Sequence, residues 1–252
     1  MAQAWLAYRS PARLRPLRQA GAMGGHVSAD VDAKRYRDGY PGQEAKESRD
    51  KRANQEFYDN SRVSTPDGDY VCNIHLQWFG QYDLLEVHHG YIQWLFPIRE
   101  PGMNMESQPL TFFEAQEMRG SREVRGRLIK SYELILDFYG MRLADPETGA
   151  VARKDTGWEG RYDNLNRSMH NYLRITRIIK CLGELGLPHF QAPWCEFFIQ
   201  EVFKEKKLSN CARSLVEYWI PVVKDDADRE RLAREARRLC GEGMTGRGPP
   251  GG

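Results

Sequence analysis

The chain has 252 residues, 40% of them hydrophobic, and a formal net charge of +2 at pH 7. This length and apolar content suffice for one sizeable core or two small ones, while so small a charge gives no field that commits the protein to nucleic acid or a membrane surface. No apolar run approaches the roughly 20 residues that a membrane-spanning helix needs, so we expect neither a membrane span nor a nucleic-acid partner.

The cysteines indicate a reducing compartment. There are five, an odd number without regular spacing, at Cys72, Cys181, Cys195, Cys211 and Cys240. A scattered odd set is typical of free thiols rather than of a disulfide framework. We therefore expect an intracellular protein with reduced cysteines, most of them filling the core.

The N-terminal quarter of the chain predicts little structure. Residues 1–29 contain four arginines and no acid, a bias shared by organelle transit peptides, but prolines interrupt any long amphipathic helix, so we favour a disordered leader or a gene-model artefact. Residues 30–69 are mostly charged and small, with almost no apolar periodicity. We assign 1–69 to a disordered or weakly ordered leader and linker, 70–240 to a helical domain and 241–252 to a flexible Gly/Pro tail.

The stretch 91–104, YIQWLFPIREPGMN, brings six apolar or aromatic residues into eight positions. Pro97 ends this run because proline lacks an N–H and disfavours helical geometry in the residue before it. An ion-pairing corner, Arg99–Glu100, follows and leads into a Pro-Gly turn. We expect Trp94 and Phe96 to lie in the core.

Residues 111–140 predict two helices. Thr111 and Glu114 have the spacing of a capping box, and Ser121 can cap the next helix. One apolar stripe in that second helix recurs at spacings of three or four: Val124, Leu128, Tyr132, Ile135 and Tyr139. Gly140 is placed to end the helix in a left-handed conformation. Residues 141–160 are turn-rich and predict a surface loop.

The chain beyond residue 166 predicts further helices. The longest runs from about 166 to 185, and one face of it carries Tyr172, Ile175, Ile179, Leu182 and Leu185. Later helices are expected to start near Pro193, Ser209 and Asp225. No strand-like alternation competes with these helices. The predicted fold class is all-α, a single irregular helical bundle domain with disordered N- and C-terminal ends.

Three blocks of sequence resemble the conserved domain of the opioid growth factor receptor family: YIQWLFP with REPGMN at 91–104, YELILDFYGMRL at 132–143, and NYLRITRIIKCLGELGL followed by HFQAP at 171–193. The resemblance covers about residues 70–226. It implies a nuclear or perinuclear protein, at most peripheral to the nuclear envelope, named for binding the opioid pentapeptide Met-enkephalin and involved in growth regulation. It brings no catalytic residues, and the family's C-terminal repeat region is not found in this sequence.

A metal site and an enzymatic site are the alternatives to a binding role. Cys72, His75, His88 and His89 have only a loose zinc-ligand spacing, and adjacent histidines rarely reach one ion, so we expect no metal and no cofactor. The sequence has no Gly-rich phosphate loop, G-x-S-x-G or H-E-x-x-H motif, which favours a non-enzymatic protein. A helical scaffold or an enzyme of unknown specificity is the alternative, and a deep pocket gathering titratable residues would favour the enzyme.

One face of the 166–185 helix carries polar residues. His170, Arg174 and Arg177 align along it, with Asn171 alongside. Such a row can grip a peptide carboxylate or a phosphate. The alternative is a structural role, either as a solvated face or with the arginines pinning the Arg99–Glu100 corner and the 141–160 loop, and we favour this structural role because charged helix faces are usually solvated.

Met-enkephalin would need three features in a site. Its N-terminal ammonium needs an acid, its aromatic rings an apolar slot and its carboxylate a cation. In this hypothesis Arg174 and Arg177 hold the carboxylate, and Glu100 holds the ammonium if its corner folds against the helix. Trp94 or Phe96 would border the slot. Further protein partners are not indicated by any motif.

Overall fold

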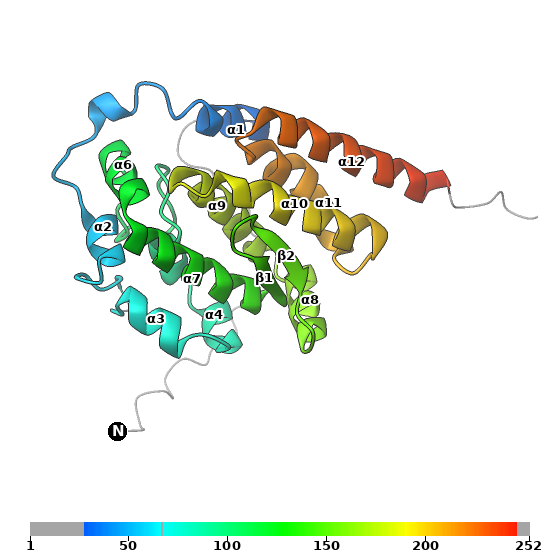
Figure 1. The fold of residues 1–252 in the computed structure, drawn as a ribbon, viewed down its shortest axis with the longest axis horizontal. Coiled ribbons are helices and arrows are strands. Elements are labelled where there is room, and N and C mark those ends of the chain that lie inside the picture. Colours follow the sequence, from blue (N-terminus) through cyan, green and yellow to red (C-terminus); the bar gives the residue numbers. More distant parts are fainter. Residues whose placement is uncertain (1–27, 67, 246–252) are drawn as a thin grey trace, which may run out of the picture.

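The computed structural model describes residues 28–66 and 68–245. They form twelve α-helices and one small antiparallel hairpin (Figure 1). The predicted helical class is therefore confirmed, with the hairpin as an addition to it. The expected leader lies outside the described residues up to residue 27, and the expected tail lies outside them from residue 246.

The first half of the chain contains seven helices before the hairpin: α1 (Ala29–Arg37), α2 (Ala53–Tyr58), α3 (Val71–Gln77), α4 (Tyr82–Val87), α5 (Tyr91–Leu95), α6 (Phe112–Gly120) and α7 (Arg122–Phe138). The hairpin and the remaining helices follow: β1 (Met141–Asp145), β2 (Ala150–Arg153), α8 (Trp158–Arg167), α9 (His170–Glu184), α10 (Gln191–Ile199), α11 (Ala212–Ser214) and α12 (Asp226–Thr245). Short 3₁₀ turns lie at Glu44–Lys46, Pro188–Phe190, Ser209–Cys211 and Ile220–Val222, and π-helical turns at Gln200–Lys204 and Leu215–Trp219.

The expectation of a disordered or weakly ordered linker over 30–69 is wrong for the described residues. This segment forms α1 and α2, and four of its aromatic side chains are buried in the core: Tyr36, Tyr40, Phe57 and Tyr58. The Tyr36 hydroxyl donates to the Lys180 carbonyl at 2.9 Å. A few large rings docking on distant elements stabilise a segment whose own sequence lacks periodicity, because each ring buries a large apolar area.

The aromatic stretch around α5 is confirmed as core. Trp94 and Phe96 are 1% and 0% exposed. The Trp94 indole N–H donates to the Thr65 carbonyl at 3.0 Å, so its polar atom is paired although the ring is buried. The buried stretch begins with α5 and extends to Ile98, which is 3% exposed.

The predicted helix starts at 111 and 121 are confirmed. The Thr111 hydroxyl accepts from the Glu114 N–H at 3.1 Å, and a Glu114 carboxylate oxygen accepts from the Thr111 N–H at 3.0 Å. The Ser121 hydroxyl accepts from the Val124 N–H at 3.3 Å. Gly140 ends the second helix with a φ of +79°, a conformation that glycine adopts without a Cβ clash.

The surface loop expected at 141–160 is instead a hairpin followed by α8. Strands β1 and β2 pair antiparallel with Leu143 opposite Val151, and the register shifts between Leu143 and Asp145. Asp145 accepts from backbone N–H groups in the turn, which is the usual role of aspartate in turns. Met141 is fully buried. The strands are too short to show an alternation in the sequence, and packing on α7 and α10 stabilises them.

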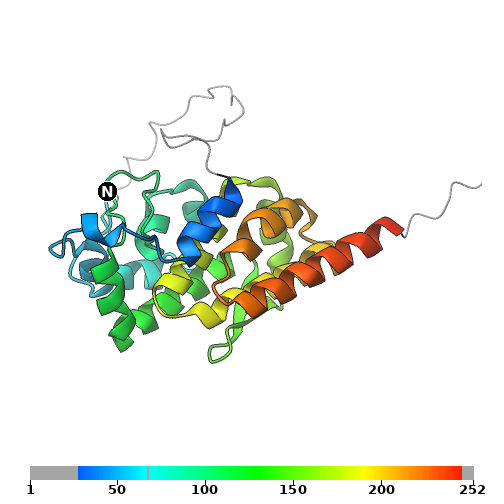
Figure 2. The same ribbon diagram turned by 90° about the horizontal axis from the view of Figure 1, so that it is seen from above.

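Two helix boundaries also differ from expectation. The predicted 166–185 helix is interrupted at Ser168 and Met169, where α8 ends and α9 begins. At the C-terminal end α12 continues to Thr245, beyond the predicted start of the flexible tail. Figures 1 and 2 show that the far end of α12 projects from the body. Within the described residues no helix combines the length and apolarity that crossing a membrane requires.

Candidate functional site

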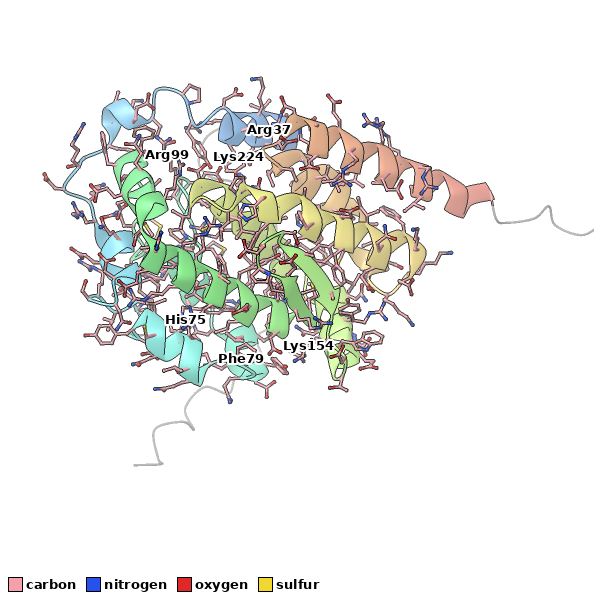
Figure 3. All side chains as sticks on the ribbon, viewed as in Figure 1. Arg37, His75, Phe79, Arg99, Lys154 and Lys224 are labelled. Atoms are coloured by element: carbon pink, nitrogen blue, oxygen red, sulfur yellow. The ribbon has the colours of Figure 1, made fainter. Side chains whose placement is uncertain are left out.

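A hollow of about 450 Å³ opens between the end of α3, helix α7 and the hairpin. We call it the hairpin pocket; its lining consists of Phe79, Glu133, Asp137, Met141, Arg142, Leu143, Lys154, Asp155 and Thr156. Figure 3 labels Phe79 and Lys154, both on the side of the molecule occupied by α3 and the hairpin. These residues come from three separate parts of the chain, so only the fold brings them together.

Asp137 is the most informative residue of the hairpin pocket, because its side chain is only 5% exposed. Its Oδ1 accepts a hydrogen bond from Lys154 Nζ, which also donates to the Tyr82 hydroxyl at 3.0 Å. Its Oδ2 is buried and has no hydrogen-bond partner among the described residues. A buried carboxylate oxygen without a donor is costly, so this atom is an unsatisfied acceptor in a residue that lines the pocket.

The lysine of this pair remains a cation. Burial lowers the pKa of Lys154, but its hydrogen bonds to Asp137 and Tyr82 outweigh that effect and the pKa is raised overall. Lys154 therefore gives Asp137 one fixed cationic partner, at Oδ1, while the buried Oδ2 has no donor among the described residues.

The rim of the hairpin pocket combines acids with apolar surface. Glu133 is exposed, and Asp155 lies 3.8 Å from the Arg142 guanidinium. Phe79 is 51% exposed and, with Leu143, contributes apolar surface to the wall. Concave sites with an apolar lining and a few convergent polar groups are the usual form of small-ligand sites. This one is suited to a cationic group attached to an apolar or aromatic body.

Arg174 does not lie on an open face. It is 6% exposed and donates to the carbonyls of Leu85 and His88 at 2.9 and 3.0 Å. It also donates to Asn171 Oδ1 at 3.2 Å. These bonds fasten the end of α4 to α9 and satisfy carbonyls that a helix end leaves without partners.

His170 and Asn171 contribute to the same junction. His170 Nε2 lies 3.0 Å from Glu86 Oε1, and Asn171 Nδ2 donates to Glu86 Oε2 at 3.2 Å. Burial lowers the pKa of His170; Glu86 opposes this effect and Arg174 adds to it. One of the three aligned residues of the predicted row, His170, thus meets the neighbouring Asn171 at Glu86, which the sequence analysis did not single out.

Arg177 and the Arg99–Glu100 corner are also engaged internally. Arg177 Nε donates to the Phe96 carbonyl at 2.9 Å, and burial lowers its pKa to about 10. Arg99, labelled in Figure 3, is 3% exposed; it pairs with Glu47 at 3.0 Å and donates to the Gly39 carbonyl at 2.8 Å. Arg174 and Arg177 thus have structural roles, but the row is not a solvated face, and its arginines bind carbonyls of residues 85–96 rather than the Arg99–Glu100 corner or the 141–160 loop.

Glu100 does fold against α9, but its partner is Lys180. Lys180 Nζ donates to the two carboxylate oxygens of Glu100 at 2.7 and 2.9 Å and to Asp32 at 2.7 Å. The Tyr40 hydroxyl also donates to Glu100, at 2.7 Å. Lys180 was missed by sequence reasoning, although a lysine inside the apolar run IIKCL was a signal. Glu100 is therefore saturated by protein groups, and the buried Trp94 and Phe96 border no open slot.

The loose zinc motif is dispersed. His75 Nε2 lies 2.8 Å from Ser131 Oγ, and burial lowers the pKa of His75 to about 4. His88 packs on Trp78 with ring centroids 5.0 Å apart. Among the described residues no group of three or more His, Cys, Asp or Glu side chains is placed to hold a metal ion.

The His75–Ser131 pair is also relevant to the enzyme alternative. Ser131 is 0% exposed, and its hydroxyl donates to the Arg127 carbonyl at 3.1 Å. A nucleophile has to reach its substrate, and this hydroxyl is covered by α3. The pair therefore has the geometry of an internal connection between α3 and α7.

Comparison with known proteins gives consistent matches. A family model described as the opioid growth factor receptor (OGFr) conserved region matches residues 47–243. The chain is 44% identical over 205 residues to the opioid growth factor receptor of Mus musculus, covering 81% of this chain and 32% of that protein. It is 43% identical over 208 residues to the Homo sapiens opioid growth factor receptor, with 82% and 31% covered. The opioid growth factor receptor-like protein 1 of Rattus norvegicus is 39% identical over 207 residues, with 82% and 44% covered.

No solved structure gives a significant match. The chain spans about a third of the length of the two receptors and under half of the receptor-like protein. The matched region contains the whole hairpin pocket, whereas α1 lies before it.

Proposed function

We propose a function from one premise: the chain belongs to the opioid growth factor receptor family. The proposed role is that of a non-enzymatic, receptor-type domain that binds an opioid peptide of the Met-enkephalin kind and takes part in growth regulation. The names of the relatives support a ligand-binding role. The family resemblance also leads us to propose a nuclear or perinuclear location.

We place the peptide in the hairpin pocket rather than on the α9 row. The donors of Arg174 and Arg177 are directed at internal carbonyls, and Glu100 is held by Lys180. In the hairpin pocket, by contrast, a carboxylate oxygen of Asp137 has no partner among the described residues. That oxygen is the single observation that carries the proposal, because a peptide ammonium that displaces the groups covering it would supply the missing donor.

The other parts of the pocket fit the remainder of such a ligand. Glu133, on the rim, adds negative charge near the bound amine. The exposed face of Phe79 offers an edge-to-face or stacked contact for an aromatic ring of the peptide. Arg142, on strand β1, supplies a cation for the C-terminal carboxylate of the peptide. A flexible peptide loses conformational entropy on binding, so we expect weak affinity.

The test is calorimetric titration of the full chain with Met-enkephalin. Glu133→Gln removes a rim charge without disturbing a buried group, and we expect it to weaken binding about threefold to tenfold. Asp137→Asn keeps the shape of the floor and should weaken binding by more than about tenfold. The N-acetylated peptide, which lacks the ammonium, should bind as poorly to the parent as the free peptide binds to Asp137→Asn.

The matched control is Glu123→Gln, which removes one charge from the same helix, α7, outside the pocket. It should leave the affinity unchanged. Absence of binding to the parent chain would refute the proposed ligand. Binding that survives both Asp137→Asn and N-acetylation would refute the proposed site.

A further inference from the structure

A second hollow, of about 470 Å³, lies between α1, the turn Ile220–Val222 and α12, and it shares no residue with the hairpin pocket. Figure 1 shows α1 next to the N-terminal end of α12, and α1 packs on the segment Leu215–Val222 that precedes α12. We call it the arginine groove; it is lined by Asp30, Arg37, Val216, Ile220, Pro221, Arg229, Glu230, Ala233, Arg234 and Arg237. Four of these are arginines and two are acids, so the groove carries a net positive charge although the whole chain is nearly neutral.

Two of the arginines are held close together by the fold. Arg37 donates to the Pro221 carbonyl, which joins α1 to the turn before α12. Arg229 donates to the Val223 carbonyl at 2.9 Å and pairs with Asp226. Burial lowers the pKa of Arg37, and the positive charge of Arg229 lowers it further. The two cations therefore repel each other, and the carboxylates of Asp226, Asp38 and Asp30 offset part of that repulsion.

The other two arginines form an open rim. Arg234 and Arg237 are exposed on α12. Arg234 lies 3.6 Å from Glu230, and Arg237 donates its Nε to the Ala233 carbonyl at 3.1 Å. Arg237 makes no ion pair with any described residue. A guanidinium has five donors in a planar fork, so both side chains keep donors available for a carboxylate.

The floor of the groove is apolar. Val216 is 45% exposed, and Ile220, Pro221 and Ala233 complete the surface beneath the arginines. No aromatic residue lines the groove, so it lacks the stacking platforms with which proteins bind single-stranded nucleic acid. It is also concave, whereas a bilayer surface is flat. Arginine forks above an apolar floor match a chain that carries both carboxylates and an apolar side chain.

We propose that the arginine groove binds an acidic peptide segment, with its carboxylates on Arg234 and Arg237 and one apolar side chain on the floor between α1 and α12. This site is independent of the opioid-peptide proposal, because the two hollows are lined by different residues. One of its walls, α1, precedes the region matched by the family model.

The test measures fluorescence anisotropy of a labelled synthetic peptide of about ten residues, long enough in extended form to cross the groove. Its sequence has one central leucine flanked by glutamates. We expect Arg234→Gln/Arg237→Gln to raise the Kd at least about tenfold in the full chain. Val216→Asp should also weaken binding, because it places a negative charge on the floor that repels the glutamates of the peptide.

The control is Arg231→Gln/Arg238→Gln. It removes the same charge from the same helix, but these arginines face Asp228 and Glu235 outside the groove. Its Kd should change less than about twofold. Circular dichroism checks that all variants stay folded.

Four outcomes would overturn the proposal. The first is that the peptide does not bind the parent chain, and the second is that the two double variants weaken its binding equally. The third is that the affinity stays the same when glutamine replaces the central leucine of the peptide. The fourth is that single-stranded RNA or anionic vesicles bind more tightly than the peptide and that Arg234→Gln/Arg237→Gln abolishes this binding. The second outcome would show a general charge effect, and the last would assign the groove to another class of ligand.

Discussion

At the scale of single residues, charged side chains on α9 hold neighbouring segments in place through internal hydrogen bonds and an ion pair. Arg174, Arg177 and Lys180 each direct donors at groups from the 85–100 region: the Leu85 and His88 carbonyls, the Phe96 carbonyl and the Glu100 carboxylate. Buried charges require this degree of pairing, since an unpaired one would be strongly destabilising. These residues therefore have a structural role rather than a surface one.

Arg174→Lys tests this role. Lysine keeps the charge but lacks the planar fork that reaches two carbonyls at once. We expect the free energy of unfolding to fall by about 2–4 kcal/mol, because buried acceptors lose their donors. Urea denaturation followed by tryptophan fluorescence measures it.

The matched control is Arg167→Lys, at a side chain that is 78% exposed and lies 3.5 Å from Asp163. It should change stability by less than about 0.5 kcal/mol. Equal stability of the two variants would show that the Arg174 contacts contribute little.

At the scale of elements, the hairpin depends on one close approach. Gly149 has a φ of +77°, and a Cβ at this position would lie 2.8 Å from Phe190 Cα. Gly149 is buried, so the hairpin turn packs directly on the 3₁₀ turn Pro188–Phe190 before α10. This contact positions the hairpin, whose strand β1 and the residues directly after β2 line the hairpin pocket.

Gly149→Ala should therefore lower the free energy of unfolding by about 2–4 kcal/mol, through backbone strain and overpacking together. Gly157→Ala is the matched control, because Gly157 has a similar φ of +71° with nothing within 4 Å of the added Cβ. It should cost only about 1 kcal/mol, from the strain alone. Thermal denaturation compares the two; an equal effect would mean that the turn moves away from Phe190 at no cost.

At the scale of the whole molecule, histidines make stability depend on pH. The pKa values of His75, His89, His170 and His189 are all lowered, with burial as the largest cause in each. For His75 the folded value is about 4, against about 6.5 in an unfolded chain. Between these values the unfolded state binds more protons, so protonation favours unfolding.

The contribution of His75 is therefore complete above about pH 6.5 and is lost as the pH falls towards about 4. We expect the urea midpoint of the chain to fall between about pH 7.5 and pH 5, a window above the titration of most carboxylates. In His75→Gln, where position 75 no longer titrates, this fall should be smaller. A midpoint that is constant or rises on acidification, or an equal slope in the variant, would contradict the prediction.

The sequence by itself determined the helical class, the family and several helix ends. The capping box at Thr111, the cap at Ser121 and the stop at Gly140 were all predictable, because each depends on residues within four positions along the chain. The burial of Trp94 and Phe96 was predictable for a similar reason, since a dense local apolar run has to lie inside.

Only the tertiary structure decided which partners the polar residues take. Glu100 meets Lys180 across 80 positions, and Tyr36 donates to the Lys180 carbonyl across 144. Asp137 keeps one unsatisfied oxygen because the hairpin brings Lys154 to just the other one. No local periodicity encodes such pairings, because they depend on how distant elements pack. The folding of residues 30–69 into helices, the hairpin and the two hollows depend on the packing of distant elements in the same way.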